Sequence, residues 1–185
     1  MALTTVPLPY GLRELYVTGY TTDAATVLDT PSVKLPYGRT LSFSAAEEFQ
    51  ELRGDDRVVT TRGQGEGVEW DLEAGGLSYE STRKMFGGSI TETGTTPNQK
   101  KVYLKKVTEA RPFFQLRGRA ISDSGGDVVC TLFRCRSTGE LEGEMSDGEF
   151  WLTSASGVAL PCLVAGTTLD GLYQFEQNET AAVLT

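Results

Sequence analysis

The sequence contains no histidine, and this absence bears on most kinds of active site. Histidine is the commonest general base, the usual partner of serine and cysteine nucleophiles, and the commonest metal ligand. A serine-histidine-aspartate triad therefore cannot be assembled from this chain. Enzymes without histidine exist, so the absence makes catalysis less expected without excluding it.

Cysteines and long apolar runs are also scarce. The three cysteines, Cys130, Cys135 and Cys162, have neither metal nor redox spacing, and their odd number argues against a disulfide framework. We expect buried thiols in a reducing cytoplasm, with Cys130 and Cys135 on opposite faces of one strand. The N-terminus does not resemble a signal peptide, and the longest weakly polar run, 157–166, is too short to span a bilayer. We therefore expect a protein made in the cytoplasm, with no metal, no cofactor and no membrane partner.

Positive charge is in the minority, with 17 basic against 25 acidic residues and a net charge of −8. Non-specific binding to nucleic acid rests on clustered Lys and Arg, so it is not expected here. Two lysine pairs, 100–101 and 105–106, flank an apolar and aromatic segment. In an acidic protein we expect these cations to pair with carboxylates across strands or subunits.

An alternation of apolar and polar residues is the dominant pattern in this sequence. It is clearest at 68–73, whereas 128–133 is apolar on both faces, as in a central strand. Several of the 21 glycines form turn-like clusters between such segments, at 63–67, 124–127 and 147–148. At 185 residues the chain suits one domain, 1–185, and the pattern predicts that it is mainly β.

One helix is predicted at about 78–86, where Ser78 is a suitable N-cap and two glycines follow. Its packed face would carry Tyr79, Thr82, Met85 and Phe86. A second segment, 45–52, has a capping box but is short, so helix and strand both remain open there.

Two acidic segments place a carboxylate at every second position: Glu69, Asp71 and Glu73, then Glu140, Glu142 and Glu144. On strands, each set would lie along one face as ordinary solvated ions. A histidine-free glycosidase using two carboxylates is an alternative, but nothing indicates an apolar pocket around either set. A solvated acidic face is the preferred interpretation.

The segment Arg53-Gly54-Asp55 spells the integrin-binding tripeptide, a string short enough to arise by chance. Its charged surroundings favour a turn that joins two strands. The polar segment 93–98 predicts a loop between two patterned segments.

A series of segments along the chain carries a resemblance to a known family. The segments are 2–9, 11–13, 41–49, 51–56, 68–76, 93–99, 110–112 and 148–151. Read in order, they resemble the major tail proteins, or tail tube proteins, of long-tailed bacteriophages that infect actinobacteria. The likeness spans nearly the whole chain and lies in the order of the segments rather than in one diagnostic motif.

The resemblance implies a β-sandwich or partial barrel of two packed sheets with one flanking helix, and terminal arms at about 1–10 and 177–185. It implies a structural virion subunit without catalytic residues, assembled into stacked hexameric rings. Genomic DNA would pass through the lumen during ejection without specific binding. The implied partners are further copies of the chain, the tape measure protein, and the tail terminator and distal tail proteins.

On this interpretation the acidic lumen would be lined by the two carboxylate sets named above. Candidates for contacts between rings or subunits are Glu47, Glu48, Glu51, Arg53, Asp55, Asp56, Arg57, Thr95, Pro97, Asn98, Lys101 and Lys105. The alternative function is a β-sandwich binding module, an adhesin or carbohydrate-binding domain, with Trp70, Trp151 or Tyr173 on an exposed aromatic platform.

Overall fold

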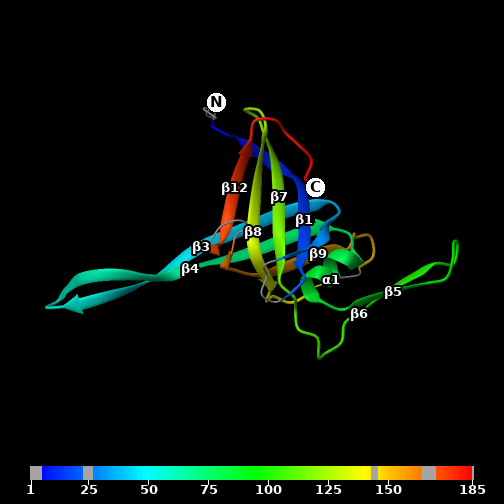
Figure 1. Ribbon diagram of the computed structural model, residues 1–185, viewed down its shortest axis with the longest axis horizontal. Coiled ribbons are helices and arrows are strands. Elements are labelled where there is room, and N and C mark those ends of the chain that lie inside the picture. Colours follow the sequence, from blue (N-terminus) through cyan, green and yellow to red (C-terminus); the bar gives the residue numbers. More distant parts are fainter. Residues whose placement is uncertain (1–5, 23–26, 143–145, 164–169, 185) are drawn as a thin grey trace.

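Antiparallel strands make up most of the computed structural model, which describes residues 6–22, 27–142, 146–163 and 170–184 (Figure 1). The predicted mainly β class is confirmed. In chain order the elements are β1 (Pro9–Tyr20), β2 (Leu28–Lys34), β3 (Gly38–Gly54), β4 (Arg57–Gly75), α1 (Tyr79–Phe86), β5 (Ser89–Thr93), β6 (Lys100–Leu104), β7 (Phe114–Ser122), β8 (Asp127–Ser137), β9 (Leu152–Leu160), β10 (Cys162–Leu163), β11 (Asp170–Gly171) and β12 (Tyr173–Asn178).

Eight of these strands form one sheet in the order β2-β1-β7-β8-β9-β4-β3, with β12 also paired to β8. Along β8, residues 127–132 pair with β12, whereas residues 134–137 pair with β9. The sheet therefore divides at β8 into two layers. Figure 1 shows β3, β4 and β9 running across the direction of β1, β7, β8 and β12. One continuous sheet thus folds back on itself to form the two layers of a sandwich.

The core lies between the two layers. Val68, Trp70 and Leu72 of β4 are buried, and the residues between them face outward, which confirms the predicted alternation. The Trp70 ring packs edge-on against Phe114 of β7, with centroids 5.6 Å apart. On the other side of the core, Phe43 of β3 packs 5.7 Å from Phe175 of β12. A fully buried side chain such as Leu72 or Phe114 contributes roughly 1.5–3 kcal/mol of hydrophobic stabilisation.

The predicted helix is confirmed as α1. Ser78 is its N-cap and accepts a hydrogen bond from the Ser81 amide, and Gly87 ends it with a φ of 80°. Met85 and Phe86 reach into the main core, and Thr82 on the same face is buried as well. The helix therefore flanks the sheet and covers part of its core.

The prediction that Cys130 and Cys135 face opposite ways is wrong. Cys130 lies opposite Gly118 and Cys135 opposite Phe114, two inward positions of β7, so both thiols point into the same core. A register shift between Phe114 and Leu116 inserts one extra residue into β8. This bulge restores the inward face after five residues, whereas a regular strand would have reversed it. All three cysteines are free thiols.

Three further segments bear on the sequence predictions: one decides between helix and strand, and two differ from what was predicted. Residues 45–52 are strand, because all of them except Glu48, which lies at a register shift, pair with β4. The glycine cluster 63–67, predicted to be a hairpin turn, lies inside β4 instead, with Gly65 at a φ of 97° beside a register shift in the ladder. The segment 140–142, read as strand, contributes only a single bridge, between Glu142 and Ser154.

A buried ionic network ties β1, β7 and β8 together. Arg119 donates to Glu14 at 3.0 Å and to Asp127 at 3.1 Å, and Lys34 donates to Glu14 at 2.8 Å. Burial alone would raise the pKa of both carboxyls. The hydrogen bonds that they accept and the charge of Arg119 outweigh burial and hold each pKa below its ordinary value.

These lowered pKa values predict acid sensitivity. The stabilisation is complete above about pH 5 and is lost as the pH falls through the lowered pKa values. Glu14→Gln should cost about 3 kcal/mol at neutral pH and reduce the loss of stability in acid. Urea unfolding from pH 7 to pH 2.5 measures both effects. Glu140→Gln, at an exposed position, is the control, and equal pH slopes in the two variants would contradict the role of Glu14.

Gly157 predicts a second stability effect. It lies opposite Trp70 on the inward face, and a Cβ there would come within 2.7 Å of the indole Cζ2 and would also collide with the Arg136 carbonyl oxygen. Gly157→Ala should therefore lower the free energy of unfolding by about 1–3 kcal/mol. Gly67→Ala, where the added methyl meets nothing within 4 Å, is the matched control. Similar denaturation midpoints for the two variants would show that the site accommodates the methyl.

Candidate functional surface: an acidic sheet face and a projecting arm

The outward face of β4 carries Glu69, Asp71 and Glu73 in one row. Glu69 and Asp71 are exposed, and Glu73 is half-buried. Glu73 forms an ion pair with Arg39, whose Nη1 donates a hydrogen bond to Glu73 Oε1 at 3.0 Å. In the described part of the chain, neither Glu69 nor Asp71 has a cation within ion-pair distance. The row is therefore predominantly uncompensated negative charge.

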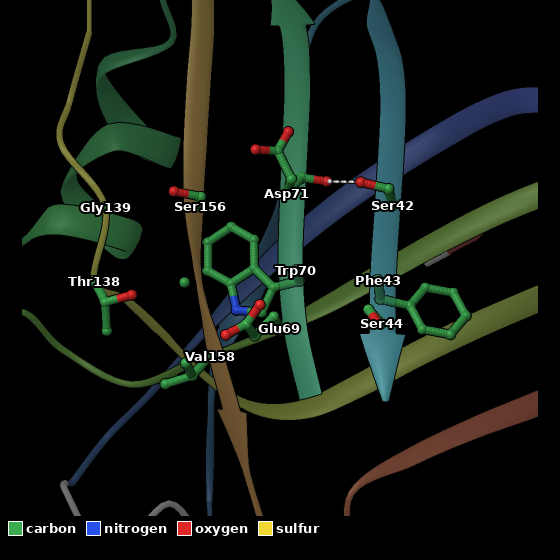
Figure 2. A pocket seen from close by; sticks show the side chains of 11 residues that line it. Ser42, Phe43, Ser44, Glu69, Trp70, Asp71, Thr138, Gly139, Ser156 and Val158 are labelled. Atoms are coloured by element: carbon green, nitrogen blue, oxygen red, sulfur yellow. Dashed lines mark hydrogen bonds between the residues drawn. The ribbon is translucent and has the colours of Figure 1, made fainter. Parts of the chain in front are cut away.

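Hydroxyl groups flank this row on both sides (Figure 2). Across the ladder, Asp71 lies between Ser42 of β3 and Ser156 of β9, and Glu73 lies between Thr40 and Ser154. Short polar side chains leave the carboxylates as the most prominent groups on this face. Together these strands form a shallow hollow of about 510 Å³ across β3, β4 and β9. We call this surface the acidic face.

A second hollow of about 490 Å³ adjoins the acidic face and brings Glu73, Glu142 and Glu149 to one place. Glu142 arrives there because its backbone bridges Ser154, the cross-strand neighbour of Glu73. Glu149 was not predicted to lie here, since no alternation of apolar and polar residues marks its position. Glu140 is exposed in the same loop, and Glu144 lies outside the described residues.

Beyond the body, β3 and β4 continue as a two-stranded hairpin, residues 46–67, which we call the arm. Figure 1 shows it projecting from the rest of the molecule. The pairing of β4 with β9 ends at Val68, so both edges of the arm are unpaired within the described chain. Its tip is a tight turn in which Asp55 and Asp56 have φ values of 53° and 59°, the conformation of a type I′ hairpin. The predicted turn at Arg53-Gly54-Asp55 is confirmed.

The arm exposes large apolar side chains as well as charges. Phe49 is 65% exposed, Leu52 61% and Val59 61%. Glu47 lies directly opposite Glu66 in the ladder, a like-charge pair that destabilises a hairpin. Arg53 is held by Glu51 through two hydrogen bonds of 3.0 and 2.8 Å. Arg57 and the two aspartates lie at the tip, and the side chain of Glu48 is outside the described set.

The other hairpin, β5–β6, carries the remaining candidate contact residues. Thr95, Pro97 and Asn98 lie in its exposed loop, which confirms the loop predicted at 93–98. Lys101 pairs with Glu92 across the hairpin at 2.9 Å and also with Glu80 of α1. Lys105 donates to the Glu109 backbone at 2.8 Å. The expectation that these cations pair with carboxylates across strands is confirmed for Lys101.

The aromatic residues proposed for a binding platform do not form one surface. Trp70 is only 2% exposed and belongs to the core. Trp151 and Tyr173 are half-buried, and Tyr173 packs against the ring of Phe175 in β12. The most exposed aromatic side chains are instead Phe150 and Tyr37.

Comparisons with known proteins assign no family to this chain. No family model matches the chain, and no curated protein matches it either. Among the described residues, no group of three or more His, Cys, Asp or Glu side chains is arranged to hold a metal ion. Within the same ranges, no helix is long and apolar enough to cross a membrane.

The arm should be dispensable for folding, because its described side chains are exposed and it projects away from the body (Figure 1). Glu47 and Glu66 are direct partners, so an Asn-Gly turn can replace residues 48–65 and join them as a two-residue hairpin. We expect the free energy of unfolding to change by less than about 1 kcal/mol. Urea unfolding monitored by tryptophan fluorescence measures this, and a loss of several kcal/mol would show that the arm stabilises the body.

Proposed function

We propose that this chain is the structural subunit of a bacteriophage tail tube, which assembles as stacked, hexameric rings around a lumen that DNA traverses. The arm is the observation that carries the proposal. An isolated two-stranded hairpin is marginally stable in water, and its free edges are templates for pairing with another chain. Besides these edges, this arm exposes the apolar side chains of Phe49, Leu52 and Val59. Such an element is best explained by a partner that covers it.

The charge of the arm favours a contact with a different surface of the neighbouring copy over arm-to-arm pairing. Residues 46–67 contain six acidic residues and three arginines, so two arms would repel each other. A contact between two different surfaces of identical subunits is heterologous, and it closes into a ring where the rotation allows it. The six-fold number comes from the family resemblance.

The acidic face supports a lumen that does not retain DNA. Alternate residues on a strand are about 7 Å apart, which is within the Debye length of about 8 Å at physiological ionic strength. A phosphate near Asp71 would therefore also be repelled by its neighbours Glu69 and Glu73. Repeated around a ring, this face would keep the duplex away from the wall. The tape measure, tail terminator and distal tail proteins would be the other partners.

Electron microscopy of the concentrated protein tests assembly. We expect rings or tubes for the natural chain and only single particles for the variant in which Asn-Gly replaces residues 48–65. That variant is a stringent control because its fold is expected to be intact. Single particles from the natural chain at high concentration would contradict the proposal, as would rings from the variant without the arm.

Charge reversal tests the lumen. With Glu69, Asp71 and Glu73 all changed to Lys, we expect folding and assembly to persist, DNA to be retained on the tubes at low salt, and infectivity to fall. A matched control reverses Asp123, Glu176 and Glu179, three exposed acidic residues outside this face. Co-sedimentation of tubes with short duplex DNA at increasing salt measures the effect. Equal DNA retention by both variants would contradict the proposal that the acidic face lines the lumen.

A further inference from the structure

The chain does not end with β12. It turns and continues through residues 179–184, which we call the C-terminal strap, across the end of the β7–β8 hairpin toward β1 (Figure 1). Gly126, with a φ of 72°, leaves room for this passage, because a Cβ there would collide with the Asn178 carbonyl oxygen and lie 3.0 Å from the Glu179 carbonyl carbon. The hairpin end is thus shaped to let the strap lie against it.

Two buried carboxylates hold the strap by its backbone. The amide of Ala182 donates to Asp127 Oδ2 at 3.0 Å, and the amide of Leu184 donates to Glu14 Oε2 at 3.1 Å. Alternate residues of an extended segment present their N–H groups to the same side, so one strap edge meets both acceptors. Hydrogen bonds to ionised acceptors are about twice as strong as neutral ones.

The strap also inserts one aliphatic side chain. Leu184 is 7% exposed, whereas the preceding Val183 is 66% exposed. The segment therefore makes its specific contacts through two amides and one leucine. Its other side chains face solvent and contribute little to recognition.

The acceptors are fixed by groups outside the strap. The Arg119 guanidinium bonds the same two oxygen atoms that receive the strap amides, and Lys34 and Asn178 bond the remaining oxygens of Glu14 and Asp127. The charges of Glu14 and Asp127 are balanced by those of Arg119 and Lys34. Because this balance does not involve the strap, the site would keep its arrangement when the strap leaves.

We propose that Glu14, Arg119 and Asp127 form a binding site for an extended peptide, and that the strap occupies it as an exchangeable ligand. The ligand class is an extended segment with amide donors at alternate residues and a leucine at the second of them. The mode resembles strand addition, except that buried carboxylates take the place of strand carbonyls. The same segment of a second copy satisfies these requirements, so the site is able to take a strap in trans.

Restoring a removed strap tests the site directly. A chain lacking residues 180–185 should melt about 10 °C below the natural chain, and the synthetic peptide 179–185 should bind it with a dissociation constant on the order of 100 µM and raise its Tm. The matched control is the same peptide with an N-methyl group on the Leu184 amide, which keeps the leucine and removes the donor. No binding by the first peptide, or equal binding by both, would overturn the proposal.

Amide hydrogen exchange in the full-length chain gives an answer even if the shortened chain does not fold. We expect the Ala182 and Leu184 amides to exchange at least about tenfold more slowly than that of Val183. Glu14→Gln should speed exchange mainly at Leu184, and Asp127→Asn mainly at Ala182. Equal exchange at the three amides in the natural chain would show that the carboxylates do not hold the strap.

Discussion

Much of the architecture depends on one constraint, which is that β8 pairs with two different strands along the same edge. Its first half is paired with β12 and its last residues with β9, and the bulge between Leu132 and Cys135 lies where one partner gives way to the other. A bulge bends a strand and increases its local twist. The sheet therefore turns here, so that β4 and β9 come to face β1 and β7 across a shared core. The outward direction of the acidic face is fixed by the same turn.

β4 shows how one strand serves two environments. Between Val68 and Ala74 it lies between β3 and β9, and each inward residue that packs in the core places its neighbour outward on the acidic face. Before Val68 the same strand has only β3 beside it, and side chains on both faces are exposed. Burial thus stabilises the body part through packing, whereas the arm has hydrogen bonds but no core. This difference is why we regard the arm as an element that another molecule covers.

The sequence predicted the features that depend on local periodicity. Strict alternation at 68–73 and the capped segment after Ser78 each point to one structure whatever surrounds them. Cys135, Glu142 and Gly65 were misplaced because their positions depend on neighbours distant in the chain. A bulge changes the face of Cys135, a bridge to Ser154 positions Glu142, and the register with β3 keeps Gly65 in a strand. None of these pairings leaves a local signal in the sequence.

The carboxylates show most clearly where composition alone stops being informative. The net charge of −8 treats every acidic residue alike, yet the fold uses them in opposite ways. Glu69 and Asp71 are exposed and have no cation in ion-pair contact among the described residues, so their charge acts outward. Glu14 and Asp127 are buried between Arg119 and backbone amides, so their charge holds the strands and the strap together. A buried carboxylate without such donors would be strongly destabilising. The donors around Glu14 and Asp127 therefore identify them as structural anchors, whereas Glu69 and Asp71 present to solvent a charge that no cation of the described residues neutralises.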